Sequence, residues 1–321
     1  MRNKVFINSF ELVRIFVCAI IILFHLEGDL ISEQLINNEY RFFSFGKESI
    51  GFFFAISGFL TSLKILKKGS IENHFVTRLI RIYPTYLFVG TLYMIMRVFF
   101  NSFDQIGIVH YTNTIFLSFG QRGVNSFVYV GWTLFYEIIF YLFIYLFRNQ
   151  FKKIMESKYS YLILILSSII LYILNLHYFI YFILGIICFA SFYKEKSMKN
   201  LKKIFLISFS LFLLKFLGIY YFTTFCILLL LISLEFSGVN FKNRWILFFS
   251  KATYSMYLIQ VLTLPFSIKL IKFIAKFDID IFSSNRLFFY IFGLFLTMIC
   301  GIGLFRIIES PLSNFLQKRL R

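Results

Sequence analysis

Long apolar runs, separated by short polar segments, extend along the whole chain. A helix needs about 20 predominantly apolar residues to cross a bilayer, and ten runs approach that length. The pattern therefore predicts an all-α protein, a polytopic transmembrane helix bundle of about ten spans. The expected spans lie near residues 8–27, 47–65, 82–100, 128–147, 160–176, 178–193, 204–219, 220–236, 252–271 and 287–308.

Positively charged residues are concentrated in alternate polar segments, which indicates the orientation of the spans. Lysines and arginines favour the cytoplasmic side of a membrane, and every second segment, beginning with the N-terminus, is basic. With an even number of spans, this distribution predicts that both termini are cytoplasmic. One exception is the outer end of the ninth span, which carries Lys269, Lys272 and Lys276. The outer segment after the first span is acidic and contains Glu27, Asp29, Glu33 and Glu39.

Composition supports a membrane protein, because 59% of the 321 residues are hydrophobic and the mean hydropathy is +0.80. The net charge of +18 is explained by basic cytoplasmic loops, and no nucleic-acid-binding motif is present, so we expect no nucleic acid partner. The cysteines stand singly in apolar runs, which predicts neither a disulfide framework nor a metal site. We expect a single domain over residues 1–321, without a soluble extension, that crosses the cell membrane many times.

The first span carries two residues that are unusual inside a lipid bilayer, Arg14 and His25. At about 100° per residue their separation is about 20° off three full turns, so both side chains lie on one helix face, roughly 16 Å apart along the axis. A charged side chain in a span costs at least ~2.5 kcal/mol and normally faces the interior of a bundle. We therefore expect this face to line a polar cavity. The alternatives are a snorkelling anchor for Arg14 and an interfacial position for His25.

The polar segment before the third span ends in TRLIRIYP, where Arg78 and Arg81 are three residues apart. Residues at this spacing share a helix face, so two guanidinium groups can converge on one anion such as a phosphate. With Arg14 on the same side of the membrane, the arginines could form a polyphosphate site at the inner face. The alternative is that they are the basic flank of a span.

The second span contains Ser57 beside two small residues, Gly51 and Gly58, in GKESIGFFFAISGFLTSL. Small residues let membrane helices approach closely. Packing is therefore the expected role of this segment, and catalysis by Ser57 is the alternative.

The fourth span contains an acidic residue, Glu137, in the apolar run GWTLFYEIIFYLFIYLF, close to Trp132 and Tyr136. A carboxylate inside a membrane needs a partner, and the candidates are Arg14, His25 or a bound substrate. Next to the histidine, Glu137 could fix the imidazole tautomer and raise its basicity, as the third member of a triad does. A structural pair of glutamate and arginine is the alternative.

At the end of the last span, Arg306 and Glu309 are three residues apart and are expected to pair with each other. The sequence has no Walker motif, glycine-rich nucleotide loop, GxSxG elbow or HExxH motif. We therefore expect no bound cofactor and no metal. The candidate chemistry rests on a histidine, several arginines and one carboxylate within membrane helices.

Six motifs in order resemble those of the acyltransferase-3 family of integral membrane acyltransferases, over nearly the whole chain. They are the arginine and histidine of the first span, GFFFAISGFL in the second, RLIRIYPTY before the third, WTLFYEIIFYL in the fourth, TYSMYLIQ in the ninth and a closing IESP. Each motif alone is weak evidence, but six at compatible spacing are hard to obtain by chance. Two positions depart from the family pattern: Gln260 stands where many members have histidine, and Thr133 replaces serine.

The resemblance implies that an acyl group, commonly acetyl, is transferred from cytoplasmic acyl-CoA to a hydroxyl, less often an amine, of a glycan or a glycolipid such as a lipid-linked sugar. It implies that His25 is the catalytic histidine and Arg14 its companion, and that Arg78 and Arg81 are candidates for binding the acyl donor. Further residues of the motifs are expected to support the site, namely Ser57, Trp132, Tyr136, Tyr254 and Tyr257.

The resulting hypothesis is that the anionic end of acetyl-CoA, or of another acyl-CoA, docks at Arg78, Arg81 and Arg14. The pantetheine arm then runs outward along the first helix, and the thioester meets His25. An unperturbed imidazole, with a pKa of about 6.5, can accept the proton of the acceptor hydroxyl and contribute roughly 10²–10⁴-fold as a general base. Glu137 would orient this site or balance its charge. A covalent acyl-imidazole is the less favoured variant.

Two other functions compete with this hypothesis. A transporter or flippase for an anionic lipid or sugar would use the same buried charges, but it would be favoured by broken helices with internal repeats, which the sequence does not show. A polysaccharide polymerase usually has a large outer loop rich in arginines, whereas the outer loop from Asn101 to Phe127 contains Arg122 alone.

Overall fold

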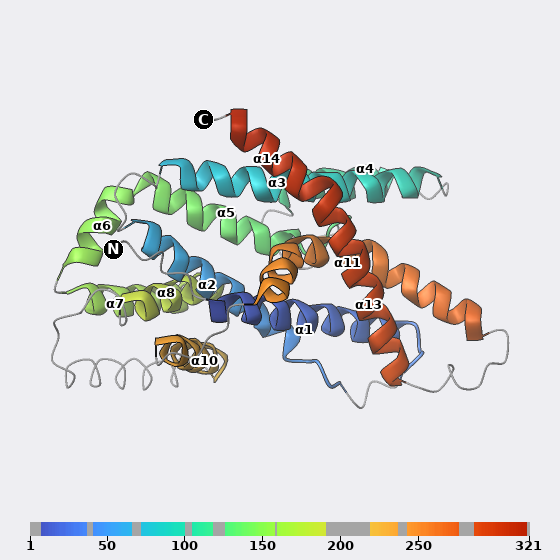
Figure 1. Cartoon of the computed structure of the whole chain (residues 1–321), viewed down its shortest axis with the longest axis horizontal. Coiled ribbons are helices and arrows are strands. Elements are labelled where there is room, and N and C mark those ends of the chain that lie inside the picture. Colours follow the sequence, from blue (N-terminus) through green and yellow to red (C-terminus); the bar gives the residue numbers. More distant parts are fainter. Residues whose placement is uncertain are drawn as a thin grey trace. The chain divides into compact units, whose positions relative to one another are not determined.

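The computed structural model describes residues 8–36, 41–65, 72–99, 105–117, 126–157, 159–190, 219–236, 243–275 and 286–319. Within these ranges the regular secondary structure is helical and includes no strand (Figure 1). The prediction of an all-α fold is therefore confirmed for the described part of the chain. The helices are α1 (Asn8–Ser32), α2 (Gly46–Ile65), α3 (Glu72–Phe99), α4 (Gln105–Ile115), α5 (Gly131–Leu146), α6 (Arg148–Glu156), α7 (Ser160–Ile173), α8 (His177–Phe189), α10 (Ile219–Phe236), α11 (Arg244–Ala275), α13 (Arg286–Leu304), the π turn η3 (Phe305–Glu309) and α14 (Ser310–Arg319).

Five described helical stretches are long and apolar enough to cross a membrane, namely Asn8–Ser32, Gly46–Ile65, Phe75–Phe99, Arg244–Ile274 and Arg286–Arg319. α5 and α6 together pass the same test as a sixth, although the chain bends by 81° between them. The protein is therefore a multi-pass membrane protein. The count of ten spans and the cytoplasmic location of both termini stay predictions. The span expected at 204–219 lies almost wholly outside the described residues.

Three helices are longer than the apolar runs that predicted them. α3 begins at Glu72, so Arg78 and Arg81 lie inside the helix and not in a loop before it. α11 begins at Arg244, and α1 continues past Glu27 to Ser32. The hydropathy pattern missed these extensions because charged residues interrupt each apolar run, namely Asp29 in α1, Arg78 and Arg81 in α3, and Lys251 in α11. Single charged residues do not prevent helix formation.

The chain divides into two compact units, each assembled from separate segments. Unit 1 comprises Met1–Val13, Ile50–Val76 and Tyr136–Asn243. Unit 2 comprises Arg14–Ser49, Thr77–Phe135 and Arg244–Arg321. Four helices, α1, α2, α3 and α5, each contribute residues to both units.

In unit 1, α2 and α8 pack so closely that their backbones meet. A Cβ atom added to Gly58 would collide with the carbonyl of Phe182, and one added to Gly185 would collide with the carbonyl of Ala55. Gly51 lies in the same way against an aromatic ring of α8. The prediction that Gly51 and Gly58 permit a close approach of helices is therefore confirmed.

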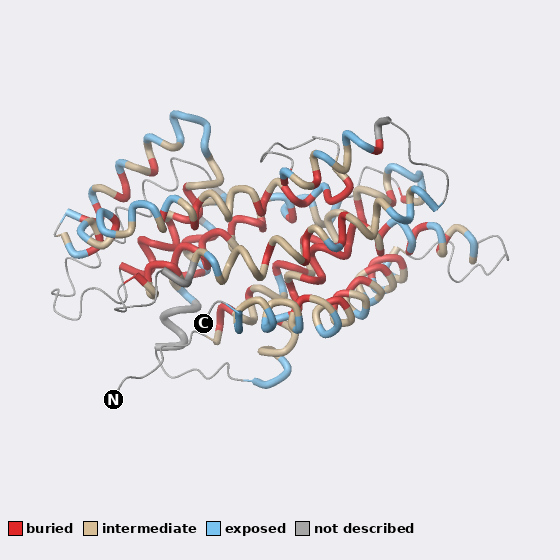
Figure 2. Tube along the Cα trace, turned by 90° about the horizontal axis from the view of Figure 1, so that it is seen from above, coloured by how far each residue is buried: buried red, intermediate tan, exposed pale blue. Residues whose placement is uncertain are grey.

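In unit 2, α11 and α13 run antiparallel and in contact. Gly301 of α13 lies against Met256 of α11, and the hydroxyl groups of Thr263 and Thr297 are 2.8 Å apart. Figure 2 shows how buried and exposed residues alternate along the helices. The face of α13 opposite to α11 is apolar and exposed. This exposed stripe suits contact with lipid, and it consists of Leu287, Ile291, Phe295 and Ile299.

Two contacts fix how α1 and α11 lie against each other within unit 2. The Cys18 thiol donates a hydrogen bond to the Thr253 carbonyl, with a sequence separation of 235, and Lys272 pairs with Glu33, with a separation of 239. Because the two separations nearly agree, the helices run parallel in this stretch. The ion pair also gives Lys272, one of the lysines that depart from the positive-inside pattern, an acidic partner at the same end of the bundle.

Candidate active site

The residues predicted for the site fall into two groups, one in each unit. Unit 1 contains Ser57, Tyr136 and Glu137. Unit 2 contains Arg14, His25, Arg78, Arg81, Trp132, Tyr254 and Tyr257.

His25 lies on α1, half-buried, with its ring between two aromatic side chains. The ring centroids of Phe24 and Tyr129 are 5.1 and 4.9 Å from that of the imidazole, and both contacts are edge-on. Within the described residues, neither imidazole nitrogen has a hydrogen-bond partner. The ring is therefore held by packing, while its nitrogens are free to accept or donate a proton.

Tyr129 was not predicted as a site residue, although it contacts the candidate catalytic histidine. It lies in the short segment before α5, and its side chain is 37% exposed. In the sequence it is one of many tyrosines at the edge of an apolar run. Only the fold brings it against His25, so no local signal could have identified it.

The start of α5 is joined to α11 by buried hydroxyl groups. The Tyr257 hydroxyl lies 2.9 Å from Thr133 Oγ1 and donates a longer hydrogen bond, 3.4 Å, to the Val130 carbonyl. Thr133 also donates to the Val130 carbonyl, at 2.9 Å. Tyr257 therefore fixes the segment that follows Tyr129, and in this way it supports the wall of the site that contacts His25.

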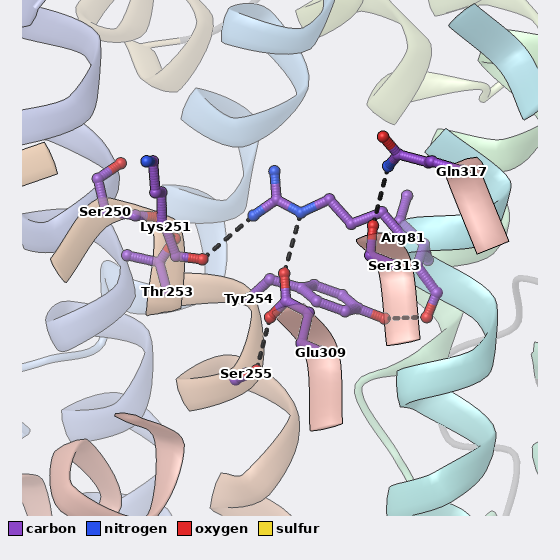
Figure 3. Close-up of polar contacts among 10 residues, drawn as sticks. Arg81, Ser250, Lys251, Thr253, Tyr254, Ser255, Glu309, Ser313 and Gln317 are labelled. Carbon is purple, nitrogen blue, oxygen red and sulfur yellow. Dashed lines mark hydrogen bonds and ion pairs between the residues drawn. The ribbon is translucent and has the colours of Figure 1, made fainter. Parts of the chain in front are cut away.

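Arg81, which is partly exposed, forms a hydrogen-bond network with α11 and the π turn (Figure 3). Its Nε donates to Glu309 Oε1 at 3.0 Å, and one terminal nitrogen donates to the Lys251 carbonyl at 3.1 Å. The other carboxylate oxygen of Glu309 accepts a hydrogen bond of 2.6 Å from Ser255. The Tyr254 hydroxyl donates to the Ile82 carbonyl at 2.6 Å and adds a second link between α11 and α3.

The predicted pair of Arg306 and Glu309 is wrong. Glu309 pairs with Arg81, and the Arg306 guanidinium lies over the Phe248 ring, 4.9 Å from its centroid. The physical reason is the π turn at Phe305–Glu309. In a π turn the backbone bonds span five residues in place of four, so residues three apart no longer share the face that they share in an α-helix.

The register of α1 and α11 places the arginines and the histidine at different levels of unit 2. Contacting residues of α1 and α11 differ in sequence number by 235 and 239. Lys251 is therefore level with residues 12–16 of α1, the turn that contains Arg14. Arg81, which binds the Lys251 carbonyl, therefore lies at the level of Arg14. Arg78 precedes Arg81 on the same helix and is half-buried. His25 is roughly 16 Å further along α1.

In unit 1, Glu137 is held by two hydroxyl groups. Its Oε1 accepts hydrogen bonds from Ser57 at 3.2 Å and from Tyr141 at 2.8 Å. Within the described residues its Oε2 has no hydrogen-bond partner. Ser57 was predicted mainly as a packing residue, and its bond to Glu137 could not be foreseen because 80 residues separate the two.

Aromatic rings surround the half-buried Tyr136, the residue before Glu137. The rings of Tyr178 and Phe179 of α8 each lie 5.2 Å from it, and Phe54 of α2 lies 6.5 Å away. Trp132, in the first turn of α5, is half-buried.

The chain was compared with known protein families. A family model described as an acyltransferase domain matches residues 7–306, which include every predicted site residue. No significant match was found among curated proteins or among solved structures.

Proposed function

Because the chain belongs to the acyltransferase-3 family and crosses the membrane several times, we propose that it moves an acyl group, commonly acetyl, from cytoplasmic acyl-CoA to a hydroxyl of a glycan or glycolipid at the cell surface. The family membership supports an acyl-transferring membrane enzyme. The acyl-CoA donor, the sugar acceptor and the location in the cell membrane are the proposed refinements.

The observation that carries this proposal is the setting of His25. Its ring is held edge-on by Phe24 and Tyr129, and among the described residues no group occupies its nitrogens. An imidazole in this state can accept the proton of an acceptor hydroxyl as that oxygen attacks the thioester carbonyl. The proton then passes to the departing CoA thiolate, so the same ring serves as base and then as acid.

The position of the arginines supports an acyl-CoA donor whose anionic end binds at one level of unit 2 and whose thioester reacts at another. Arg14 and Arg81 share the level of Lys251, and Arg78 lies on the same helix as Arg81. Arg81 keeps one terminal nitrogen without a partner in the described part of the chain, and its side chain is 32% exposed. We propose that this terminal nitrogen of Arg81, together with Arg78, binds phosphate groups of the acyl-CoA donor. The long arm of the donor would then cover the distance to His25.

Glu137 stays a predicted catalytic residue. Its carboxylate is oriented by Ser57 and Tyr141 through one oxygen, which leaves the second oxygen available as an acceptor. A fixed carboxylate with a free oxygen is suited to binding a hydroxyl group or a positive charge.

The proposal is tested by mass spectrometry of surface glycans and glycolipids from cells with the gene and from cells in which it is deleted. We expect the loss of one acyl mass increment, equal to that of an acetyl group or correspondingly larger for a longer acyl group. Complementation with the wild-type gene should restore the increment, and complementation with the His25→Ala variant should not. Identical glycan and glycolipid masses in all three strains would contradict the proposal.

A further inference from the structure

Gln260 of α11 is fully buried and half of its amide group is unsatisfied. Its Nε2 donates a hydrogen bond of 2.8 Å to the Tyr257 carbonyl, one turn earlier on the helix. Its Oε1 is buried and has no hydrogen-bond partner among the described residues.

The orientation of this amide is fixed by chemistry. The Tyr257 carbonyl can only accept a hydrogen bond, so the NH₂ group of Gln260 must face it. A rotated amide would set two acceptors against each other. The oxygen is therefore the atom left without a partner, and a buried acceptor without a donor carries a desolvation penalty that native proteins rarely retain without reason.

The unsatisfied oxygen lies close to the level of His25. The separations of 235 and 239 between α1 and α11 place Gln260 level with residues 21–25 of α1. The backbone carbonyl of Tyr257 accepts the hydrogen bond from the Gln260 amide, and the side-chain hydroxyl of Tyr257 contacts Thr133 at the start of α5. The segment just before Thr133 carries Tyr129, which touches the imidazole.

A second buried polar atom without a partner lies in the same part of unit 2. The hydroxyl of Tyr86 on α3 is buried and unpartnered among the described residues, and it lies against Gly131, the first residue of α5. Both atoms in unit 2 lack the hydrogen bond that buried polar groups normally make, and a polar group of a bound substrate would supply it.

We propose that Gln260 is a substrate-binding residue, whose Oε1 accepts a hydrogen bond from an N–H or O–H donor of a substrate bound beside His25. The proposal rests on the proposed acyl transfer. Two groups of the proposed substrates can donate this hydrogen bond. One is an amide N–H of the pantetheine arm, and the other is a hydroxyl of the acceptor sugar next to the one that is acylated.

The test compares steady-state kinetics of the wild type, Gln260→Met and Thr263→Val in the full-length purified protein. Methionine is close to glutamine in size and shape but cannot accept this hydrogen bond. Thr263→Val is the matched control, because this hydroxyl is buried on the same helix and already bonded to Thr297. Acetyl-CoA and the glycolipid fraction of the host are varied in turn. Gln260→Asn, which keeps the amide but withdraws its oxygen by one methylene group, replaces the methionine variant if that variant does not fold.

We expect Gln260→Met to raise the KM for one substrate by roughly tenfold, the effect of one buried hydrogen bond, with little change in kcat. A raised KM for acetyl-CoA would identify the pantetheine amide, and a raised KM for the glycolipid would identify a sugar hydroxyl. The control variant should keep both KM values. If Gln260→Met and Gln260→Asn keep both KM values while the wild type is active, the inference is overturned, because the oxygen then faces a water molecule or a packing defect. If the wild type transfers no acyl group, the proposed function itself fails.

Discussion

Arg81 and Glu309 form an ion pair of 3.0 Å that joins α3 to the π turn before α14, although 228 residues separate them in the sequence. The Glu309 side chain is 2% exposed, so its charge is removed from water and depends on this partner. Arg81 was predicted to bind the acyl donor, and the structure gives it a second task, the neutralisation of a buried carboxylate.

Replacing Arg81 by glutamine should destabilise the protein by about 3 kcal/mol or more, because it leaves the Glu309 charge buried and unpaired. The measurement is chemical or thermal unfolding of the purified protein in detergent. Glu309→Gln in the same background should recover part of the loss, since no uncompensated charge then remains.

Arg306→Gln is the matched control for this pair, because Arg306 was expected from its spacing to be the partner of Glu309 but lies over the Phe248 ring. It should change the free energy of unfolding by less than about 1 kcal/mol. An Arg306 variant that is as unstable as the Arg81 variant would contradict the assignment of the pair.

Glu27→Gln should loosen the segment that leads into α2. The Glu27 carboxylate, buried near the C-terminal end of α1, accepts hydrogen bonds from the backbone N–H groups of Phe42 and Phe43 and from the Tyr290 hydroxyl, at 2.9, 3.0 and 3.0 Å. A glutamine would turn an NH₂ group toward one of these donors, at a cost of about 1–3 kcal/mol. Hydrogen exchange at the amides of Phe42 and Phe43 should become faster. Tyr290→Phe removes a single bond and should have a smaller effect, and unchanged exchange in Glu27→Gln would show that the carboxylate does not hold this segment.

Gly185→Ala should destabilise unit 1, because the added methyl group would meet the Ala55 carbonyl. Forced overpacking costs about 1–3 kcal/mol in well-packed interiors. Gly303→Ala is the control, since no described residue outside its own helical turn has an atom within 4 Å of its Cβ position. It should be neutral or stabilising by up to about 1 kcal/mol, because alanine favours a helix. Equal unfolding temperatures for the two variants would disprove the backbone contact between α2 and α8.

Ser57→Ala should lower kcat by about fivefold through loss of the hydrogen bond that orients Glu137. Tyr141→Phe should act in the same direction, because it removes the other bond to the same oxygen. Ser62→Ala provides the control on α2, since within the described ranges this hydroxyl bonds to the Gly58 carbonyl of its own helix and to no other group. If Ser57→Ala keeps the wild-type kcat, Glu137 does not act in catalysis through a fixed orientation.

The sequence was sufficient for those features that depend on composition and local spacing. The apolar runs predicted a helical membrane protein and placed Arg14 and His25 in one helix, and the small residues Gly51 and Gly58 correctly indicated close packing. The six motifs identified the family, whose match covers residues 7–306.

Features that depend on long-range contacts could not be predicted in this way. The partners of Glu309 and Glu137 are distant in the sequence, and Tyr129 contacts His25 only because the chain folds back. Glu27, counted from the sequence in the acidic segment that follows the first span, is instead a buried carboxylate in α1. In each case the polar residue was visible, but its partner was set by packing, which periodicity does not encode.

The central claim is that His25 performs proton transfer in an acyl transfer reaction. The most direct test measures release of CoA from acetyl-CoA, coupled to acylation of host glycolipid, by the purified wild type and by the His25→Ala and Arg14→Ala variants in lipid vesicles. We expect His25→Ala to lose at least about 100-fold in rate while its unfolding temperature is unchanged, and Arg14→Ala also to be strongly impaired. Transfer by a folded His25→Ala protein at close to the wild-type rate would contradict it.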